Sequence, residues 1–517
     1  MLRESSQRSI SLSPYSGIYD AVVPQDHLLR KVKDNIDFSF VNPMLKKQYC
    51  EALGRPAKEP EMMFKLMFMK KIYDLSDVRV VSQAQTDMAV KYFLDLDPEA
   101  PMIDPSLMTK FRKLRITEDI LEEMLRETVR QAIEKGIIKS KTIIMDSTHT
   151  QAAVRPKTVT QVLRELSRQL RREIYQNLYE LSDKFPEKPE ITAELDEEID
   201  YTVRLLDAVA AGIENCDNQE LQALYARIRE LIDTDEIREI RSKDDEDARF
   251  GHKTPTSTFF GYKNHIAMTE ERIIAGMEVT SGEEADVNCL IALSERAKNN
   301  GVDVKEIVGD RAYVSSGNLA YCDEMGISLI ALTNPAVAAS AEAKDDGFHF
   351  NKDANALQCP AGELSTCVHK KKAEKGDSTY WTYRFSRKKC NVCPQKDQCA
   401  AFRKRDSYYR VVVLSDKMQE RLEFEKSEAF SKRLEIRSRI EEKNGEMKQA
   451  HGLRRADSMG LEAMRLQAYF TAFAVNAKRI VTLAAVNYPH MPSACKKLRE
   501  FSPLQLFLLR FRRLRAA

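Results

Sequence analysis

The sequence predicts an α/β protein with a mixed-sheet core, preceded by an all-helical domain and interrupted by one helical and one cysteine-containing insertion. Three observations lead to this fold class. Apolar residues recur at helical spacings before residue 136, and short apolar runs alternate with helical stretches between residues 141 and 332. Five of the ten cysteines lie in one polar, lysine-rich stretch of the second half. The order strand, hairpin, helix, strand, helix, strand is typical of a mixed sheet.

The composition is that of a globular protein with room for several domains. The chain has 517 residues, of which 43% are hydrophobic and 31% charged, and its formal net charge is only +2. A uniformly basic coat for nucleic acid is therefore excluded, and any DNA contact must come from local patches. The polar opening stretch, and the lack of any run of about 18 apolar residues, predict a cytoplasmic protein that does not enter a membrane.

The N-terminal part is expected to be a flexible arm over residues 1–24 and a helical domain over residues 25–136. Apolar side chains at helical spacings predict a helix within residues 62–72, and Ser76 is expected to cap the next one. A further helix is expected to open at Asp104-Pro105-Ser106. Short helices joined by tight turns fit a helix-turn-helix-like DNA-binding module, and they fit an ordinary helical bundle as well.

The α/β core is expected over residues 137–487. Its first strand is KTIIMD, residues 141–146, and residues 258–282 alternate like a β-hairpin. Between them, residues 151–247 repeat apolar side chains every three or four positions, which predicts a charged helical insertion. Residues 338–410 make up the cysteine-containing insertion.

Two aspartates follow short apolar runs that read as buried strands. Asp146 ends KTIIMD, and Asp310 ends VKEIVGD. Ligand sites in open α/β sheets gather at the carboxyl ends of strands, so these two acids are candidates for one site. The alternative is structural, since an acid at a strand end often serves as a cap or turn residue.

A third acid lies in RSRIEEKNGEMK, within residues 417–450, which are expected to form a long charged helix. Arg437, Glu441 and Lys448 differ in heading by only about 40°, so they share one helix face. The alternative is an exposed helix laced with salt bridges. Three converging carboxylates would repel one another unless a hard cation such as Mg²⁺ neutralised them, and paired ions of this kind suit phosphodiester chemistry.

These motifs together resemble the DDE transposases of bacterial insertion sequences, most closely the group typified by insertion sequence 1182. The resemblance spans roughly residues 20–485. It is carried by DPSLMTKFRK, IIMDSTHTQA, FFGYKNHIAMT, VTSGEEAD, VGDRAYVSSGN and RSRIEEKNGEMK. In the last motif the family has a Tyr, Arg, Glu and Lys at fixed spacing. Arg437, Glu441 and Lys448 match, whereas Leu434 stands in the tyrosine position.

The resemblance implies a ribonuclease-H-like core with Asp146, Asp310 and Glu441 as catalytic, metal-binding acids for Mg²⁺ or Mn²⁺. It implies metal-dependent cleavage at transposon ends and strand transfer into target DNA, by a nucleoid-associated protein that forms a homodimer on double-stranded DNA. Arg437 and Lys448 are expected to contact DNA phosphates. Lys263 is a further DNA-binding candidate, or else a lysine on the hairpin surface.

Two other functions fit the same residues. A ribonuclease-H-like nuclease would use the same acids to cut nucleic acid without joining it. A catalytically inactive, transposase-derived DNA-binding protein would not need all three acids, and their presence argues against that alternative.

The cysteines between the second and third acids have metal-like spacing. Cys390, Cys393 and Cys399 form C-x2-C-x5-C, and Cys359 lies upstream. Four thiolates would make a closed structural Zn²⁺ site in a reducing compartment. Cys367 is a rival fourth ligand, and the alternative is a set of partly exposed thiols in a polar loop.

Local clusters of basic residues are the candidate DNA surfaces, although any one of them could simply be a solvated face. Arg112 is the candidate within the N-terminal module, with further lysines and arginines beside it. The clusters comprise Lys110, Arg112, Lys113 and Arg115; Lys370, Lys371, Lys372, Lys388 and Lys389; and Arg510, Arg512, Arg513 and Arg515. The last group lies in a basic C-terminal tail expected over residues 488–517, which could also be a membrane-surface or partner helix.

Overall fold

The computed structural model groups the chain into two compact units. A helical unit combines Met1–Lys139 with Tyr469–Ala517, and a sheet unit comprises Ser140–Ala468. The structure describes residues 13–15, 17–50, 57–254, 256–333, 348–351, 356–372, 379–399, 401–402, 408–413 and 416–487. Most of the expected N-terminal arm, and the basic tail from residue 488, lie outside these described residues. None of the helices within them is both long and apolar enough to cross a membrane.

The helical unit is built from short helices whose starts follow from local sequence. Its helices are α1 (Ile18–Val22), α2 (Leu28–Asn35), α3 (Val41–Lys46), α4 (Pro60–Ile72), α5 (Asp77–Thr86), α6 (Met88–Phe93), α7 (Ser106–Arg115), α8 (Glu118–Glu134) and the later part of α19 (Leu461–Asn487). The predicted cap at Ser76 is confirmed, since its hydroxyl accepts a hydrogen bond from the Arg79 amide at 3.3 Å. The predicted helix start at Ser106 is confirmed as well, with its amide donating to Asp104 Oδ1 at 2.8 Å.

An aromatic cluster forms the core of this unit. The ring of Phe473, from α19, packs against Phe38, Phe64 and Phe68 with centroids 5.9, 5.4 and 5.3 Å apart. All four side chains are at most 3% exposed. A residue near the far end of the chain therefore completes the core of helices near its start.

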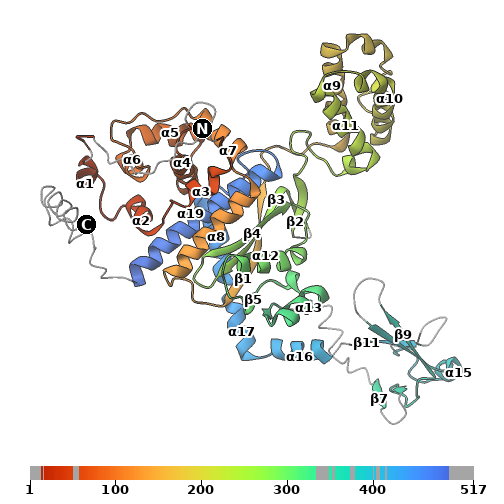
Figure 1. Ribbon diagram of the computed structural model, residues 1–517. Coiled ribbons are helices and arrows are strands. Elements are labelled where there is room, and N and C mark those ends of the chain that lie inside the picture. Colours follow the sequence, from red (N-terminus) through yellow and green to blue (C-terminus); the bar gives the residue numbers. More distant parts are fainter. Residues whose placement is uncertain are drawn as a thin grey trace. The chain divides into compact units, whose positions relative to one another are not determined.

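The sheet unit contains the mixed sheet that the sequence predicts. Its strands are β1 (Thr142–Gln151), β2 (Arg249–Thr254), β3 (Ser257–Thr269), β4 (Ile274–Ser281), β5 (Glu306–Val308) and β6 (Ser328–Ile330). The order is β2-β3-β1-β5-β6, with β4 also paired to β3. β3 pairs antiparallel with β1 and β4, whereas β5 pairs parallel with β1 and β6. Helix α12 (Leu290–Asn299) precedes β5, and α13 (Ser316–Met325) connects β5 to β6 (Figure 1).

Two predicted elements differ from the structure. The first strand does not end at Asp146 but runs on to Gln151, because β3 pairs with it along this whole length. The stretch 417–450 is not one helix. It divides into α16 (Asp416–Glu425), α17 (Glu428–Glu435) and α18 (Ser438–Ala450), and the Ser427 hydroxyl caps α17 by accepting from the Phe430 amide at 3.1 Å.

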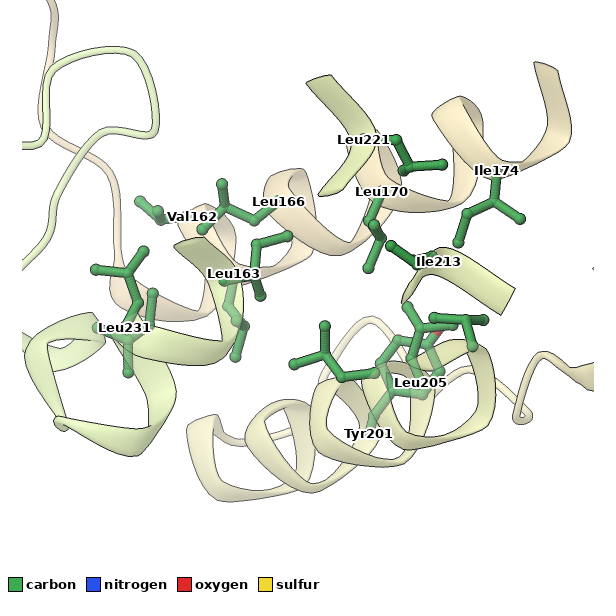
Figure 2. Packing of buried hydrophobic residues seen from close by; sticks show 14 of the residues in the cluster. Val162, Leu163, Leu166, Leu170, Ile174, Tyr201, Leu205, Ile213, Leu221 and Leu231 are labelled. Atoms are coloured by element: carbon green, nitrogen blue, oxygen red, sulfur yellow. The ribbon is translucent and has the colours of Figure 1, made fainter. Parts of the chain in front are cut away.

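The helical insertion forms the three helices that its periodicity predicts. They are α9 (Val159–Asn177), α10 (Leu195–Glu214) and α11 (Gln219–Asp233). Figure 2 shows side chains from the three helices, such as Leu166, Leu205 and Leu231, gathered between them, and all three of these leucines are at most 4% exposed. Thr158 and Gln161 make reciprocal side-chain bonds to each other's backbone amides, which is a capping box at the start of α9. The insertion therefore has a hydrophobic core of its own.

The cysteine-rich insertion is small and mainly β. Its elements are β7 (His349–Asn351), β8 (Ala356–Gln358), β9 (Cys367–Lys372), β10 (Thr379–Arg384), α15 (Arg387–Asn391) and β11 (Tyr408–Val413). The last three strands form a sheet in the order β11-β10-β9. Among the described residues, the buried hydrophobic cluster here comprises only Leu357, Tyr383, Phe385 and Ala401.

Candidate functional site

Asp146 lies on β1, and Asp310 follows two residues after the end of β5, the strand that pairs in parallel with β1. The register pairs Thr142 of β1 with Glu306 of β5, and the same offset relates Asp146 to Asp310. The pairing ends at Ile144 and Val308, and beyond it the two acids are near enough for the charge of Asp310 to raise the pKa of Asp146. Asp310 is exposed, and its Oδ1 accepts a hydrogen bond from the Arg311 amide at 2.7 Å.

The environment of Asp146 disfavours its charged form. Burial, with the negative charges of Asp286 and Asp310, raises the pKa of the Asp146 carboxyl to about 6, although the Ser147 amide and the Arg437 charge act in the opposite direction. The buried phenol of Tyr313 lies among the same acids. Burial, followed by the charges of Asp286, Asp146 and Asp310, raises its pKa well above the usual value. The fold therefore gathers three aspartates in one region, two of which the sequence indicated.

Asp286 is the third acid of this region, and the sequence predicts no role for it. It opens the 3-10 helix η3 (Asp286–Cys289), and its carboxylate accepts from Ser147 Oγ at 2.9 Å and from Lys263 Nζ at 3.2 Å. Lys263 also donates to the Glu284 carbonyl at 2.7 Å. The predicted DNA-binding Lys263 is thus bound within the fold rather than free on the hairpin surface. Asp286 ends the VTSGEEAD motif, but an acid that starts a short helix carries no local sign of a catalytic role beyond that of a cap.

Helix α18 brings the third motif alongside β1. Arg437 Nη2 lies 2.9 Å from Glu441 Oε1, and Lys448 Nζ lies 3.5 Å from His149 Nδ1 on β1. The Glu441 side chain is 58% exposed and directed at Arg437, whereas Asn444 Nδ2 donates to Asp146 Oδ2 at 3.0 Å. The residue of α18 that touches the first acid is therefore Asn444 and not Glu441.

Contacts at both ends hold this helical segment against β1. On α17, Arg433 donates to Glu306 Oε1 at 2.9 Å and to Thr142 Oγ1 at 2.8 Å. After α18, Thr150 Oγ1 donates to the Leu453 carbonyl at 2.7 Å. These bonds fix where the α18 side chains meet the sheet.

The predicted acids do not converge as a finished metal centre. Across the described ranges, no three His, Cys, Asp or Glu side chains come close enough together to hold a metal ion. The structure brings Asp146 and Asp310 into one region and leaves Glu441 in an ion pair with Arg437. The positive charge of Arg437 lowers the pKa of Asp146 in turn.

Burial also alters Lys448. Removal from water, followed by the positive charges of Lys253 and Arg454, lowers the pKa of Lys448 to about 8. The neighbouring His149 is affected in the same sense: burial and the Lys448 charge lower its pKa to about 4, so it is neutral at physiological pH. The site therefore offers a lysine that titrates near neutrality.

The predicted DNA-binding Arg112 carries an internal ion pair in the helical unit. Its Nη2 lies 2.5 Å from Asp77 Oδ2, and its Nη1 donates to Asp77 Oδ1 at 2.9 Å. Arg115 likewise donates to the Gln48 carbonyl. Lys110 and Lys113 are exposed on the same helix, α7. Two of the four residues of this predicted basic cluster, Arg112 and Arg115, thus make contacts within the helical unit.

Four cysteines line one cavity in the cysteine-rich insertion. Cys359, Cys390, Cys393 and Cys399 all border a cavity of about 380 Å³. The rival ligand, Cys367, is exposed on β9 with its Sγ 3.2 Å from His369 Nε2 and does not line this cavity. Within the part of the chain that the structure describes, no three of these thiols come close enough together to hold a metal ion.

Two family models match the chain. Residues 18–114 match the family described as Transposase domain (DUF772), and residues 358–481 match the family described as Transposase DDE domain. The second match contains Arg437, Glu441, Asn444 and Lys448, whereas Asp146 and Asp310 lie outside both matched ranges. Searches of curated proteins and of solved structures give no match. The chain therefore carries two transposase domains, the second of them a DDE domain, and these imply a function in DNA transposition.

Proposed function

We propose that this chain is a DDE transposase that cleaves DNA at insertion-sequence ends and transfers the strand into target DNA, with Asp146, Asp310 and Glu441 as its acidic triad. The observation that carries the proposal is the parallel pairing of β1 with β5 just before Asp146 and Asp310, with α18 held alongside β1. The order of antiparallel strands followed by parallel strands supports a ribonuclease-H-like core. The assignment to the group of insertion sequence 1182 rests on the resemblance of the motifs.

The donor set suits Mg²⁺ or Mn²⁺. Asp146, Asp310 and Glu441 offer hard carboxylate oxygens, and the mutual repulsion of Asp146, Asp286 and Asp310 is what a divalent cation would relieve. When bound, such ions supply activation of a water or 3′-hydroxyl and stabilisation of the leaving oxygen. Glu441 would exchange its Arg437 partner for this role, which would free the guanidinium for a DNA phosphate.

The rest of the proposal concerns DNA. Arg437 and Lys448 flank the acids and are proposed to hold the scissile strand, while Arg112 and Lys263 stay weaker candidates because both are paired internally. The protein is proposed to act in the cytoplasm, on the nucleoid, as a homodimer on double-stranded DNA.

Substitutions in the acidic triad that abolish strand joining but leave DNA binding intact would support the triad. Asp310→Asn and Glu441→Gln are expected to abolish strand joining while leaving the affinity for transposon-end DNA within about threefold, because the carboxylates serve the metal rather than the phosphates. The measurement is joining of end DNA into a target plasmid with Mg²⁺, beside a gel-shift titration. Glu442→Gln is the matched control, since Glu442 pairs with Arg272 at 2.8 Å instead.

The same assay separates the alternative functions. Cutting without joining by the unchanged chain would indicate a nuclease, and binding with no reaction would indicate an inactive derivative. Full joining by Glu441→Gln would contradict the triad.

The titration of Lys448 predicts a pH dependence of DNA binding. Its pKa of about 8 means that the cation is present below that pH and lost above it. The slope of the logarithm of the affinity for end DNA against the logarithm of the salt concentration reports the number of phosphate contacts. Between pH 7 and pH 9.5 this slope is expected to decrease by the equivalent of about one contact. Lys448→Arg should remove this change, because a guanidinium stays charged throughout. Equal pH dependence in both proteins would exclude a phosphate contact by Lys448.

We also propose a structural zinc ion in the cysteine-rich insertion. Cys359, Cys390, Cys393 and Cys399 line one cavity, and the hydrophobic cluster beside them is small among the residues that the structure describes, so a bound metal would add stability to the insertion. Zinc binding would draw the four thiolates together.

Zinc content is expected at about one equivalent per chain and well below that in Cys359→Ser. The matched control is Cys367→Ser, which removes a cysteine of the same insertion outside the cavity and should leave zinc unchanged. Unchanged zinc in Cys359→Ser, or none in the unaltered protein after purification in zinc-containing buffer, would contradict the proposal.

A further inference from the structure

Asn444 is the side chain of α18 that contacts the first acid. Its Nδ2 donates to Asp146 Oδ2 at 3.0 Å, and the residue is only 8% exposed. A carboxylate can only accept a hydrogen bond, so the atom bonded to Asp146 is the amide nitrogen of Asn444 and not its amide oxygen.

That amide oxygen is buried without a partner. Asn444 Oδ1 has no hydrogen bond within the described part of the chain. Buried polar atoms are nearly always satisfied, and a lone acceptor calls for an explanation, such as an ordered water, an ion or a catalytic role. Because Oδ1 and Nδ2 belong to one planar amide, this free acceptor lies in the same small volume as the Asp146 carboxylate.

The position of Asn444 on α18 fits that role. It lies seven residues after Arg437 and four before Lys448, so all three share one stripe of the helix. The bonds of Arg433 and Thr150 at the two ends of the segment fix the distance between this stripe and β1. Asn444 therefore meets Asp146 within a helical segment that is hydrogen-bonded to β1 before and after it.

We propose that Asn444 supplies a neutral oxygen, its Oδ1, to the divalent ion that Asp146 holds, while its Nδ2 keeps the Asp146 carboxylate in position. This inference rests on the proposed function. Amide oxygens, like carboxylates, are suitable ligands for Mg²⁺ and Mn²⁺. A neutral donor adds a ligand without adding a further negative charge to Asp146, Asp286 and Asp310, which already repel one another.

Mn²⁺ binding to the full-length protein tests the inference without relying on activity. Asn444→Leu keeps the branch at Cγ but replaces both polar atoms with methyl groups. It is expected to weaken Mn²⁺ binding about tenfold or more, measured by the loss of the free-ion electron paramagnetic resonance signal. Asn444→Asp retains an oxygen and is expected to stay within about threefold of the unaltered protein. The Mn²⁺ concentration for half-maximal cleavage of end DNA should shift in parallel.

Two controls make the outcome decisive. Gln449→Ala removes an exposed amide from the same helix and should leave the Mn²⁺ affinity unchanged, and thermal unfolding of each variant checks that it is folded.

Unchanged Mn²⁺ affinity in Asn444→Leu, or equal losses of affinity in Asn444→Leu and Asn444→Asp, would overturn the inference. If Asp146→Ala loses Mn²⁺ while Asn444→Leu keeps it, the inference alone fails. If neither the unaltered protein nor Asp146→Ala binds Mn²⁺, the proposed function fails with it.

Discussion

Asp146→Asn is expected to abolish strand cleavage and, without divalent ions, to make the folded protein more stable at pH 8. The two effects have one cause. Burial, with the charges of Asp286 and Asp310, raises the pKa of Asp146 to about 6 from 3.8. At pH 8 the charged carboxylate therefore costs the folded state about 1–3 kcal/mol, since one pKa unit corresponds to about 1.4 kcal/mol.

The sign of this effect fixes its pH window. A carboxyl whose folded pKa is raised destabilises the fold fully above that pKa, and the cost disappears as pH falls through about 6 towards 3.8. The gain in Asp146→Asn should thus be present at pH 8 and absent near pH 4. An asparagine can still accept the hydrogen bond from Asn444, so the substitution does not break that contact.

Thermal unfolding in a chelator at pH 8, 6 and 4 measures the stability, and cleavage of end DNA measures the activity. Cleavage should fall by more than about a hundredfold, beyond what the loss of a supporting partner costs a metal site. Asp303→Asn is a suitable control, since Asp303 is an exposed acid of the same unit that pairs with Lys141. A loss of stability at pH 8 would show that the Asp146 charge is already compensated within the fold.

Phe473→Ala is expected to destabilise the helical unit by about 3–5 kcal/mol. Its ring makes edge-to-face contacts with Phe38, Phe64 and Phe68, so truncation removes buried area from four side chains and leaves a cavity. Because this residue lies far beyond residue 136, the expected helical domain of residues 25–136 should not fold stably when produced alone.

Urea unfolding followed by circular dichroism gives the free energy of unfolding. Phe250→Ala is the matched control, because that phenylalanine is 42% exposed and should cost far less. A cost below about 1 kcal/mol for Phe473→Ala, or cooperative unfolding of residues 25–136 produced alone, would contradict this account of the core.

Local sequence patterns were sufficient to predict most of the helices and strands. Alternation identified the hairpin, caps such as Ser76 located helix starts, and helical spacing identified the three helices of the insertion. These signals are readable because each depends on residues within one or two turns of each other. The same local geometry placed Arg437 and Glu441 on one helix face, which their ion pair bears out.

Contacts between distant segments determined the rest. The first strand continues past Asp146 because β3 offers partners to its whole length. Asp146 and Asp310, more than a hundred residues apart, come near each other because β1 and β5 pair in parallel just before them. Asn444 and Asp286 enter the site only because α18 and η3 pack there. Periodicity predicts which side of a helix or strand is buried, but not which other element packs against that side. The packing partner depends on the arrangement of the whole sheet unit.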